Sequence, residues 1–215
     1  MINPHTPTNF TRSCAELEEF LFFCVCVAGK NSHQTAAKLH RFLEVIREVE
    51  NGAASWTPFE AILKGPIDWR RELRHQKLGK YALTEQAFQM AAETFGGGHI
   101  VTEPTVETLM QIPGISHKTA VFFLLHSRRG FCGIPLDTYA LKWLRHQFPT
   151  LMVPKSSPQN ASTYRPLESL FLGECLRLGV SPHQADITCW RSKGAAIDPR
   201  ELQEEPGIVR TDHLK

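Results

Sequence analysis

Apolar residues recur every three or four positions along most of the chain, which is the spacing of amphipathic helices. Ser13 and Glu16 form a capping box at the start of one such stretch, and Leu17, Phe20 and Leu21 follow it at helical spacing. No stretch shows the alternation of a half-buried strand, so we predict an all-α fold. The same apolar spacing predicts further helices over residues 32–47, 56–63, 68–78, 87–95, 105–110, 116–125, 137–144, 167–178 and 182–192.

Two segments lack this periodicity. Residues 1–12 contain Pro4 and Pro7 and are predicted to form an irregular arm. Residues 149–166 are rich in proline and serine, so we predict a long surface connection there.

The composition is that of an ordinary globular protein, with 42% hydrophobic and 21% charged residues. A net charge of +2 does not by itself indicate a nucleic-acid-binding protein, so any basic surface must come from local clustering. The longest apolar run, residues 20–28, is about half as long as a membrane-spanning helix and follows acidic residues, so we expect neither a membrane anchor nor a signal peptide. The cysteines lie mostly in apolar periodic stretches without a CxxC pair, which favours reduced thiols in an intracellular protein over a disulfide framework and predicts no bound metal.

The most basic stretch of the chain is residues 68–80. Arg74 and Lys77 belong to it, and apolar residues such as Trp69 are interleaved with the charges. The pattern fits a solvated helical face as well as it fits a surface that contacts DNA phosphates.

Residues 109–120 predict two helices joined by a short turn that contains Pro113 and Gly114. Ser116 can cap the second helix. Free main-chain amides and the positive end of the dipole at a helix start together favour an anion, such as one DNA phosphate. The alternative is a plain helical hairpin in which Gly114 only shapes the turn.

The run from Ile112 to Ala120, followed by Asp137 nineteen residues after Lys118, resembles the helix-hairpin-helix DNA glycosylase superfamily. The resemblance extends upstream through residues 78–95 and covers about residues 14–195, most specifically residues 78–145. It implies a two-lobed helical fold with DNA in a cleft, residues 30–134 forming one lobe and residues 1–29 plus 135–215 the other. It also implies that the hairpin binds the DNA backbone through Ile112, Gly114, Ser116 and His117.

The sequence departs from the family pattern at three places. Ser116 stands where the hairpin usually has a second glycine, and Tyr139 stands where a histidine is frequent. The carboxy-terminal four-cysteine cluster of endonuclease III is absent, so no iron–sulfur cluster and no other cofactor is expected. A monovalent cation at the hairpin is compatible with the resemblance, although Ser116 could alter its site.

The resemblance assigns catalytic roles to Lys118 and Asp137. Lys118 would attack C1′ of the flipped nucleotide and form a Schiff base, which makes the enzyme a bifunctional glycosylase and AP lyase. The Asp137 carboxylate would stabilise the positive charge that develops at C1′. The alternatives are that Lys118 only contacts a phosphate and that Asp137 only caps a helix.

The pocket for the base is less specified by the sequence. Asn31 and Gln34 could hydrogen-bond a flipped base, and Phe23 or Trp69 could stack on it, although each also fits a structural role. We expect 8-oxoguanine in double-stranded DNA as the substrate, and a monomeric enzyme in the cytoplasm. Another damaged or modified base, or a non-catalytic helix-hairpin-helix module that only binds DNA, is the alternative.

Overall fold

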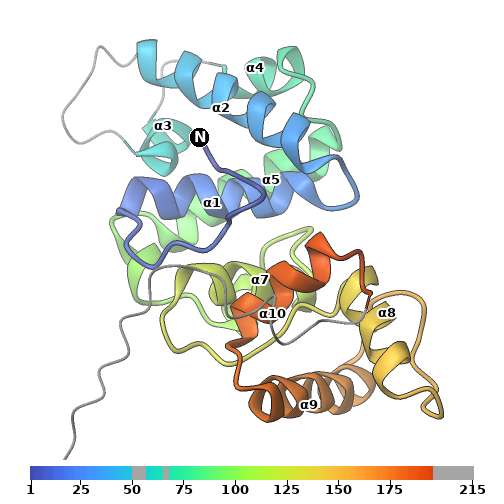
Figure 1. Cartoon of the computed structure of the whole chain (residues 1–215). Helices are drawn as coiled ribbons and strands as arrows, with labels where there is room; N and C mark the ends of the chain where they lie inside the picture. The colour runs from blue at the N-terminus through green and yellow to red at the C-terminus, as the bar shows by residue number, and fades with distance from the viewer. Residues whose placement is uncertain (50–56, 65–67, 196–215) are drawn as a thin grey trace, which may run out of the picture. The chain divides into compact units, whose positions relative to one another are not determined.

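The computed structural model describes residues 1–49, 57–64 and 68–195. Every regular element in these ranges is helical, which confirms the all-α prediction (Figure 1). The predicted helix start at residue 56 lies outside the described ranges. The helices are α1 (Cys14–Val27), α2 (Ser32–Val49), α3 (Pro58–Lys64), α4 (Trp69–His75), α5 (Tyr81–Phe95), the 3₁₀ helix η1 (His99–Val101), α6 (Val106–Leu109), α7 (His117–Ser127), α8 (Thr138–Gln147), α9 (Ala161–Leu178) and α10 (Pro182–Arg191).

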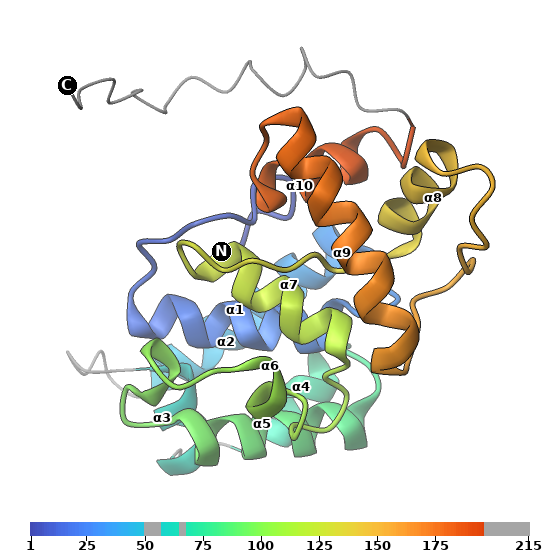
Figure 2. The same cartoon turned by 90° about the horizontal axis from the view of Figure 1, so that it is seen from below.

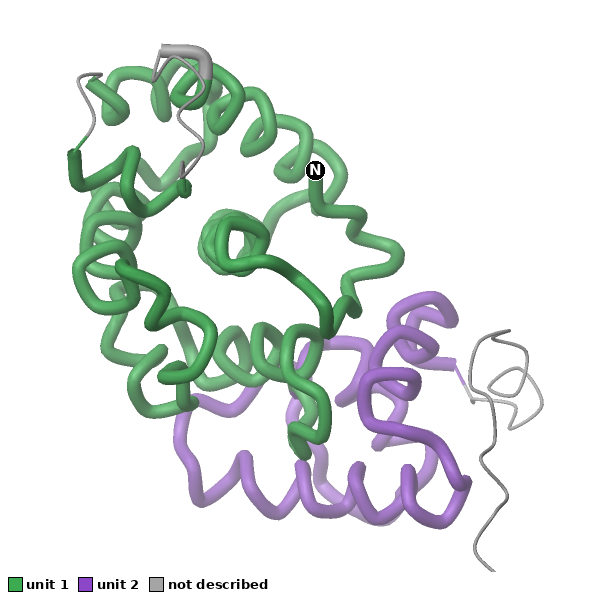
Figure 3. Tube along the Cα trace, turned by 90° about the vertical axis from the view of Figure 1, so that its left-hand side faces the viewer, with its two compact units in different colours: residues 1–135 green, residues 136–215 purple. Residues whose placement is uncertain are grey.

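The chain divides into two compact units, unit 1 (Met1–Pro135) and unit 2 (Leu136–Lys215), coloured separately in Figure 3. Helix α1 is the centre of unit 1. It contacts α2, α3, α5 and α7, and Figure 3 shows it nearly end-on with the other helices of its unit around it. Because α1 is covered on nearly all sides, its residues from Phe20 to Cys26 are all buried.

This packing corrects the expected grouping of residues 1–29 with the second lobe. The Ser13–Glu16 capping box is present and starts α1 as predicted. The arm before it is fastened to α7, because the Arg12 guanidinium donates to the carbonyl oxygens of Asn9 (3.0 Å) and His126 (2.8 Å) and lies over the Phe20 ring. Burial of α1 among the helices of unit 1 therefore places residues 1–29 in that unit.

Helix α2 shows the amphipathic pattern that the sequence predicts. The Asn31 side chain accepts a hydrogen bond from the Gln34 amide (3.0 Å) at its start. The predicted apolar stripe of Ala36, Leu39, Leu43 and Ile46 is buried in the core of unit 1.

Unit 2 contains α8, α9 and α10, and Figure 2 shows the long helix α9. The N-cap of α9 is Asn160. Helix α9 begins at Ala161, six residues before the predicted start, so the connection predicted over residues 149–166 is shorter. Pro166 lies inside this helix. The early turns are held by the Asn160 side chain, which accepts from the Thr163 amide (2.9 Å), and by Tyr164, whose ring is buried. Capping and burial together outweigh the helix-breaking tendency of proline here.

Three further observations concern the described ranges. No helix among them is both long and apolar enough to span a bilayer. All six cysteines are free thiols. These ranges also contain no group of three or more His, Cys, Asp or Glu side chains that could hold a metal ion.

Candidate active site

The turn between α6 and α7 is held in place from the inside of unit 1. Ile112 and Ile115 are buried on either side of Gly114, which has a left-handed φ of +84°. The Ile112 amide donates to the Leu109 carbonyl and the Ile115 amide donates to the Ile112 carbonyl, each at 3.1 Å. These buried side chains and hydrogen bonds therefore fix the backbone of the turn and the main-chain groups that it exposes.

Ser116 caps α7 as predicted. Its hydroxyl oxygen accepts from the Thr119 amide (3.3 Å) and lies 3.1 Å from the Thr119 hydroxyl. Within the described part of the chain, the main-chain amides of Gly114, Ser116 and Lys118 donate to no acceptor. Three available N–H groups at the positive end of a helix form a geometry that suits an anion.

The structure corrects the role expected for Ile112. Its side chain is buried and its amide is already bonded to Leu109, so it supports the turn and presents neither group to a ligand. His117 is the first residue of α7 and is half-buried. Of the residues predicted to bind the DNA backbone, Gly114 and Ser116 have main-chain amides without a hydrogen-bond acceptor among the described residues.

Lys118 is the second residue of α7, in the same turn as these amides. Its side chain is half-buried. Among the described residues of unit 1, no hydrogen-bond acceptor or carboxylate engages its ammonium group. The position combines a firm backbone with a side-chain nitrogen that can reach a bound molecule.

Asp137 is the N-cap of α8 and belongs to unit 2. One carboxylate oxygen, Oδ1, accepts from the amides of Tyr139 and Ala140, each at 2.8 Å. The preceding residue, Leu136, is buried, and its amide donates to the Tyr164 hydroxyl at 3.0 Å. These bonds fix both the backbone and the carboxylate of Asp137, and a capping role is compatible with a chemical one.

Sequence reasoning missed the contribution of Tyr164, because the residue fell in the predicted connection. Burial raises the pKa of the Tyr164 hydroxyl, and the nearby carboxylates of Glu168, Asp186 and Asp137 raise this pKa further. The hydroxyl therefore stays protonated beside acidic groups. Asn160 as a cap, with Tyr164 and Leu167 at helical spacing behind it, is the signal that could have found the helix.

The predicted phosphate contacts on α4 differ from each other. Arg74 forms an ion pair with Glu85 of α5 (2.5 Å), and its contact with a DNA phosphate stays a prediction. Lys77 follows α4, is exposed and has a left-handed φ of 56°. Lys77 therefore remains available for an anion, whereas Arg74 links two helices.

Two of the four residues suggested for a base pocket are corrected. Phe23 is 2% exposed and its ring stacks with Phe20 in the core. Trp69 is 4% exposed, with the Arg70 guanidinium 4.4 Å from its ring centre. A side chain packed in this way has no free face for a base. Asn31 and Gln34 are exposed at the start of α2, and their role in base recognition stays a prediction.

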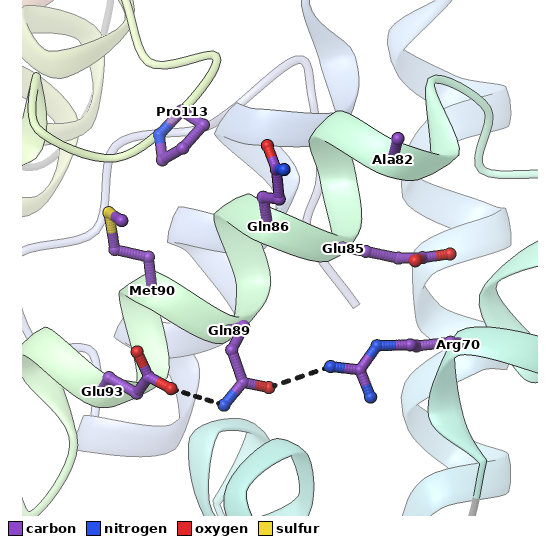
Figure 4. Close-up of a pocket in the computed structure, with 8 residues that line it drawn as sticks. All are labelled: Arg70, Ala82, Glu85, Gln86, Gln89, Met90, Glu93 and Pro113. Atoms are coloured by element: carbon purple, nitrogen blue, oxygen red, sulfur yellow. Dashed lines mark hydrogen bonds between the residues drawn. The ribbon is translucent and has the colours of Figure 1, made fainter.

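An open hollow of about 590 Å³ lies between α4, α5 and the hairpin turn (Figure 4). The Gln89 amide links two of its charged residues, since it donates to Glu93 (2.7 Å) and accepts from Arg70 (3.5 Å). No nucleophile lies in contact with a general base in this lining, so the hollow is not assigned a catalytic role. It consists of Arg70, Ala82, Glu85, Gln86, Gln89, Met90, Glu93 and Pro113.

Comparison with solved structures gives a match over most of the chain. The fold is similar to the crystal structure of Methanocaldococcus jannaschii 8-oxoguanine glycosylase/lyase in complex with 15mer DNA containing 8-oxoguanine, with a TM-score of 0.55 and 18% sequence identity. The match covers 87% of this chain and 86% of that chain. Neither a protein-family model nor a curated protein matches the sequence. The comparison shows that the chain shares the helical fold of that solved structure.

Proposed function

We propose that the protein is a DNA glycosylase with AP lyase activity that removes a damaged base, 8-oxoguanine first among them, from double-stranded DNA. The first turn of α7 carries this proposal, because it presents the amides of Gly114, Ser116 and Lys118 together with the Lys118 side chain. The solved structure with the similar fold is an 8-oxoguanine glycosylase/lyase with DNA bound.

The hairpin would bind one backbone phosphate through its amides, which carry no sequence information. The target nucleotide must leave the base stack for its glycosidic bond to be reached. A phosphate fixed at the start of α7 would bring the neighbouring sugar towards Lys118. The Asp137 carboxylate, held by two amides at 2.8 Å, would stabilise positive charge at C1′.

In the first chemical step, the neutral Lys118 amine forms a bond to C1′ and the bond from C1′ to the base breaks. The electron pair leaves with the base, which takes up the proton that the amine releases. Opening of the sugar ring then gives an imine between Lys118 and C1′. Loss of a C2′ proton expels the 3′ phosphate and cuts the strand.

Borohydride trapping tests this assignment, because it reduces the imine to a stable covalent adduct. Duplexes that each carry one lesion are incubated with the protein and borohydride, and adducts are resolved on a denaturing gel. Lys118→Gln should abolish the adduct. Lys64→Gln is the matched control, because Lys64 is an exposed residue of α3 that pairs with Glu60 (3.4 Å).

Asp137→Asn should abolish base excision with little loss of duplex binding. An adduct that persists in Lys118→Gln would refute the role of Lys118, and unchanged excision by Asp137→Asn would remove Asp137 from the mechanism. Binding without excision of any lesion by the wild type would favour the non-catalytic module. Excision of a different lesion alone would keep the enzyme class and change the substrate.

A further inference from the structure

Four lysines take part in the contacts between two segments of unit 1 that are far apart in sequence. The Lys30 ammonium donates to the Leu78 carbonyl, Lys38 donates to the Lys77 carbonyl (3.2 Å) and Lys80 donates to the Ala28 carbonyl (3.2 Å). The loop between α1 and α2 is thereby joined to the turn between α4 and α5. We call Lys30, Lys38, Lys77 and Lys80 the lysine cluster.

The turn that carries half of the lysine cluster has an uncommon backbone. Lys77 and Lys80 both have left-handed φ angles, 56° and 51°, and Gly79 between them has a φ of 73°. The left-handed conformation is unfavourable for a residue with a Cβ. A side chain at Gly79 would begin 3.4 Å from the Lys30 nitrogen, so the chain passes close to this ammonium. Such strain is kept where the surrounding structure fixes it, and it often marks a functional site.

The charge of the lysine cluster is not balanced by its contacts. Within the described ranges, the ammonium groups of Lys30, Lys38 and Lys80 donate to main-chain carbonyls, and no ammonium group of the cluster engages a carboxylate. Burial lowers the pKa of Lys30, and repulsion from Lys80 and Lys38 lowers this pKa further, while the Cys26 thiol has the opposite effect. An anion placed here would relieve that repulsion.

The lysine cluster and the hairpin amides meet the same end of α5. Lys80 is the residue that precedes α5, and Leu83 lies in its first turn. The Leu83 side chain packs on the hairpin, since a Cβ on Gly114 would lie 3.1 Å from its Cδ2 atom.

We propose that the lysine cluster is a second backbone-phosphate site, which binds the same DNA as the hairpin and adds charge-dependent affinity. This inference rests on DNA being the substrate of the proposed function. Lys38, Lys77 and Lys80 would contact the phosphate oxygens. Lys30 is half-buried against the Leu78 carbonyl and would hold the turn in shape.

The test is the salt dependence of binding to an undamaged duplex, measured by fluorescence anisotropy. Each phosphate contact contributes about 0.9 to the slope of log affinity against log salt concentration. The variant Lys38→Gln/Lys77→Gln/Lys80→Gln should lower the magnitude of this slope by about 1 and weaken binding at low salt.

A matched control removes the same charge elsewhere on the surface. Arg47, Lys64 and Lys155 are exposed residues outside the lysine cluster, and the triple variant Arg47→Gln/Lys64→Gln/Lys155→Gln should retain the wild-type slope. An equal loss of slope in both triple variants would refute the proposal, since it would show a general charge effect.

An arginine variant separates charge from the shape of the turn. Lys38→Arg/Lys77→Arg/Lys80→Arg keeps the charges and should keep the slope. If it behaves like the glutamine variant, the effect comes from the turn and the proposal fails. The undamaged duplex needs no chemistry, so the slope measurement holds whether or not a lesion is excised, and a failure of the proposed glycosylase activity is seen separately in the trapping assay.

Discussion

Replacing Gly114 by alanine tests how the hairpin turn is held. Gly114 has a φ of +84°, and a Cβ placed on it would lie 3.1 Å from Cδ2 and 3.2 Å from Cγ of Leu83. Gly130 has a similar φ of +79° with nothing within 4 Å of the same position. Both glycines lie in unit 1, so the pair isolates the contact with Leu83 from the cost of the backbone.

The expected effect follows from two contributions. Alanine in the left-handed region loses about 1 kcal/mol, which applies to both variants. In Gly114→Ala the Leu83 side chain must also move by a few tenths of an ångström. Leu83 is 39% exposed and can turn away, at a cost of about 0.5–1.5 kcal/mol for an unfavourable rotamer. We expect Gly114→Ala to lose about 2 kcal/mol and Gly130→Ala about 1 kcal/mol.

Thermal unfolding followed by circular dichroism measures the difference. At about 2–4 °C per kcal/mol for a chain of this size, Gly114→Ala should melt about 4–8 °C lower than wild type and Gly130→Ala about 2–4 °C lower. In a Leu83→Ala background the two glycine variants should become equal. Equal melting shifts in the wild-type background would refute the role of the Leu83 contact.

Three further predictions concern buried polar groups. Burial raises the pKa of Glu18, whose carboxylate accepts from the Phe59 amide (2.8 Å). Wild type should therefore lose stability as the pH rises from the pKa of the unfolded state, about 4.3, towards the higher pKa of the folded state. In denaturant unfolding between pH 4 and 7, the stability of Glu18→Gln should rise relative to that of wild type, and a difference that does not change with pH would contradict this. Burial first, and then Glu18, raises the pKa of the Cys14 thiol to about 11. Alkylation of Cys14 at pH 8 should therefore be at least about 100-fold slower in the folded than in the unfolded protein, and its rate should rise about tenfold per pH unit. Equal alkylation rates in the folded and unfolded protein would refute the raised pKa. Tyr164→Phe leaves the buried Leu136 amide without its acceptor and should cost about 1–3 kcal/mol in denaturant unfolding, so an unchanged midpoint would show that this bond contributes nothing.

Features that depend on neighbouring residues could be predicted from the sequence. Ser13, Ser116 and Asp137 each cap a helix as expected, because a cap needs only its own side chain and an amide two or three residues later. The hairpin is likewise contained within residues 109–120. Its glycine and serine therefore predict the turn and the cap of α7 without any tertiary contact.

Features that depend on distant contacts could not be predicted. Helix α1 is apolar nearly all round, so periodicity cannot tell whether Phe23 faces the core or a ligand. The early start of α9 depends on the burial of Tyr164, which outweighs the local signal of Pro166. Burial of this kind is decided by residues that lie far away along the chain.

The lysine cluster shows why a net charge of +2 says little about DNA binding. One carboxylate close in sequence is already engaged, since Glu85 pairs with Arg74. In the total charge each acidic residue counts against a basic residue wherever the two lie, but it lowers the local potential mainly around its own partner. Lys77 and Lys80 therefore keep their local positive potential although the sum over the chain is close to zero. The quantity that predicts a phosphate site is the set of basic residues left after such pairing, and pairing between α4 and α5 is decided by the fold.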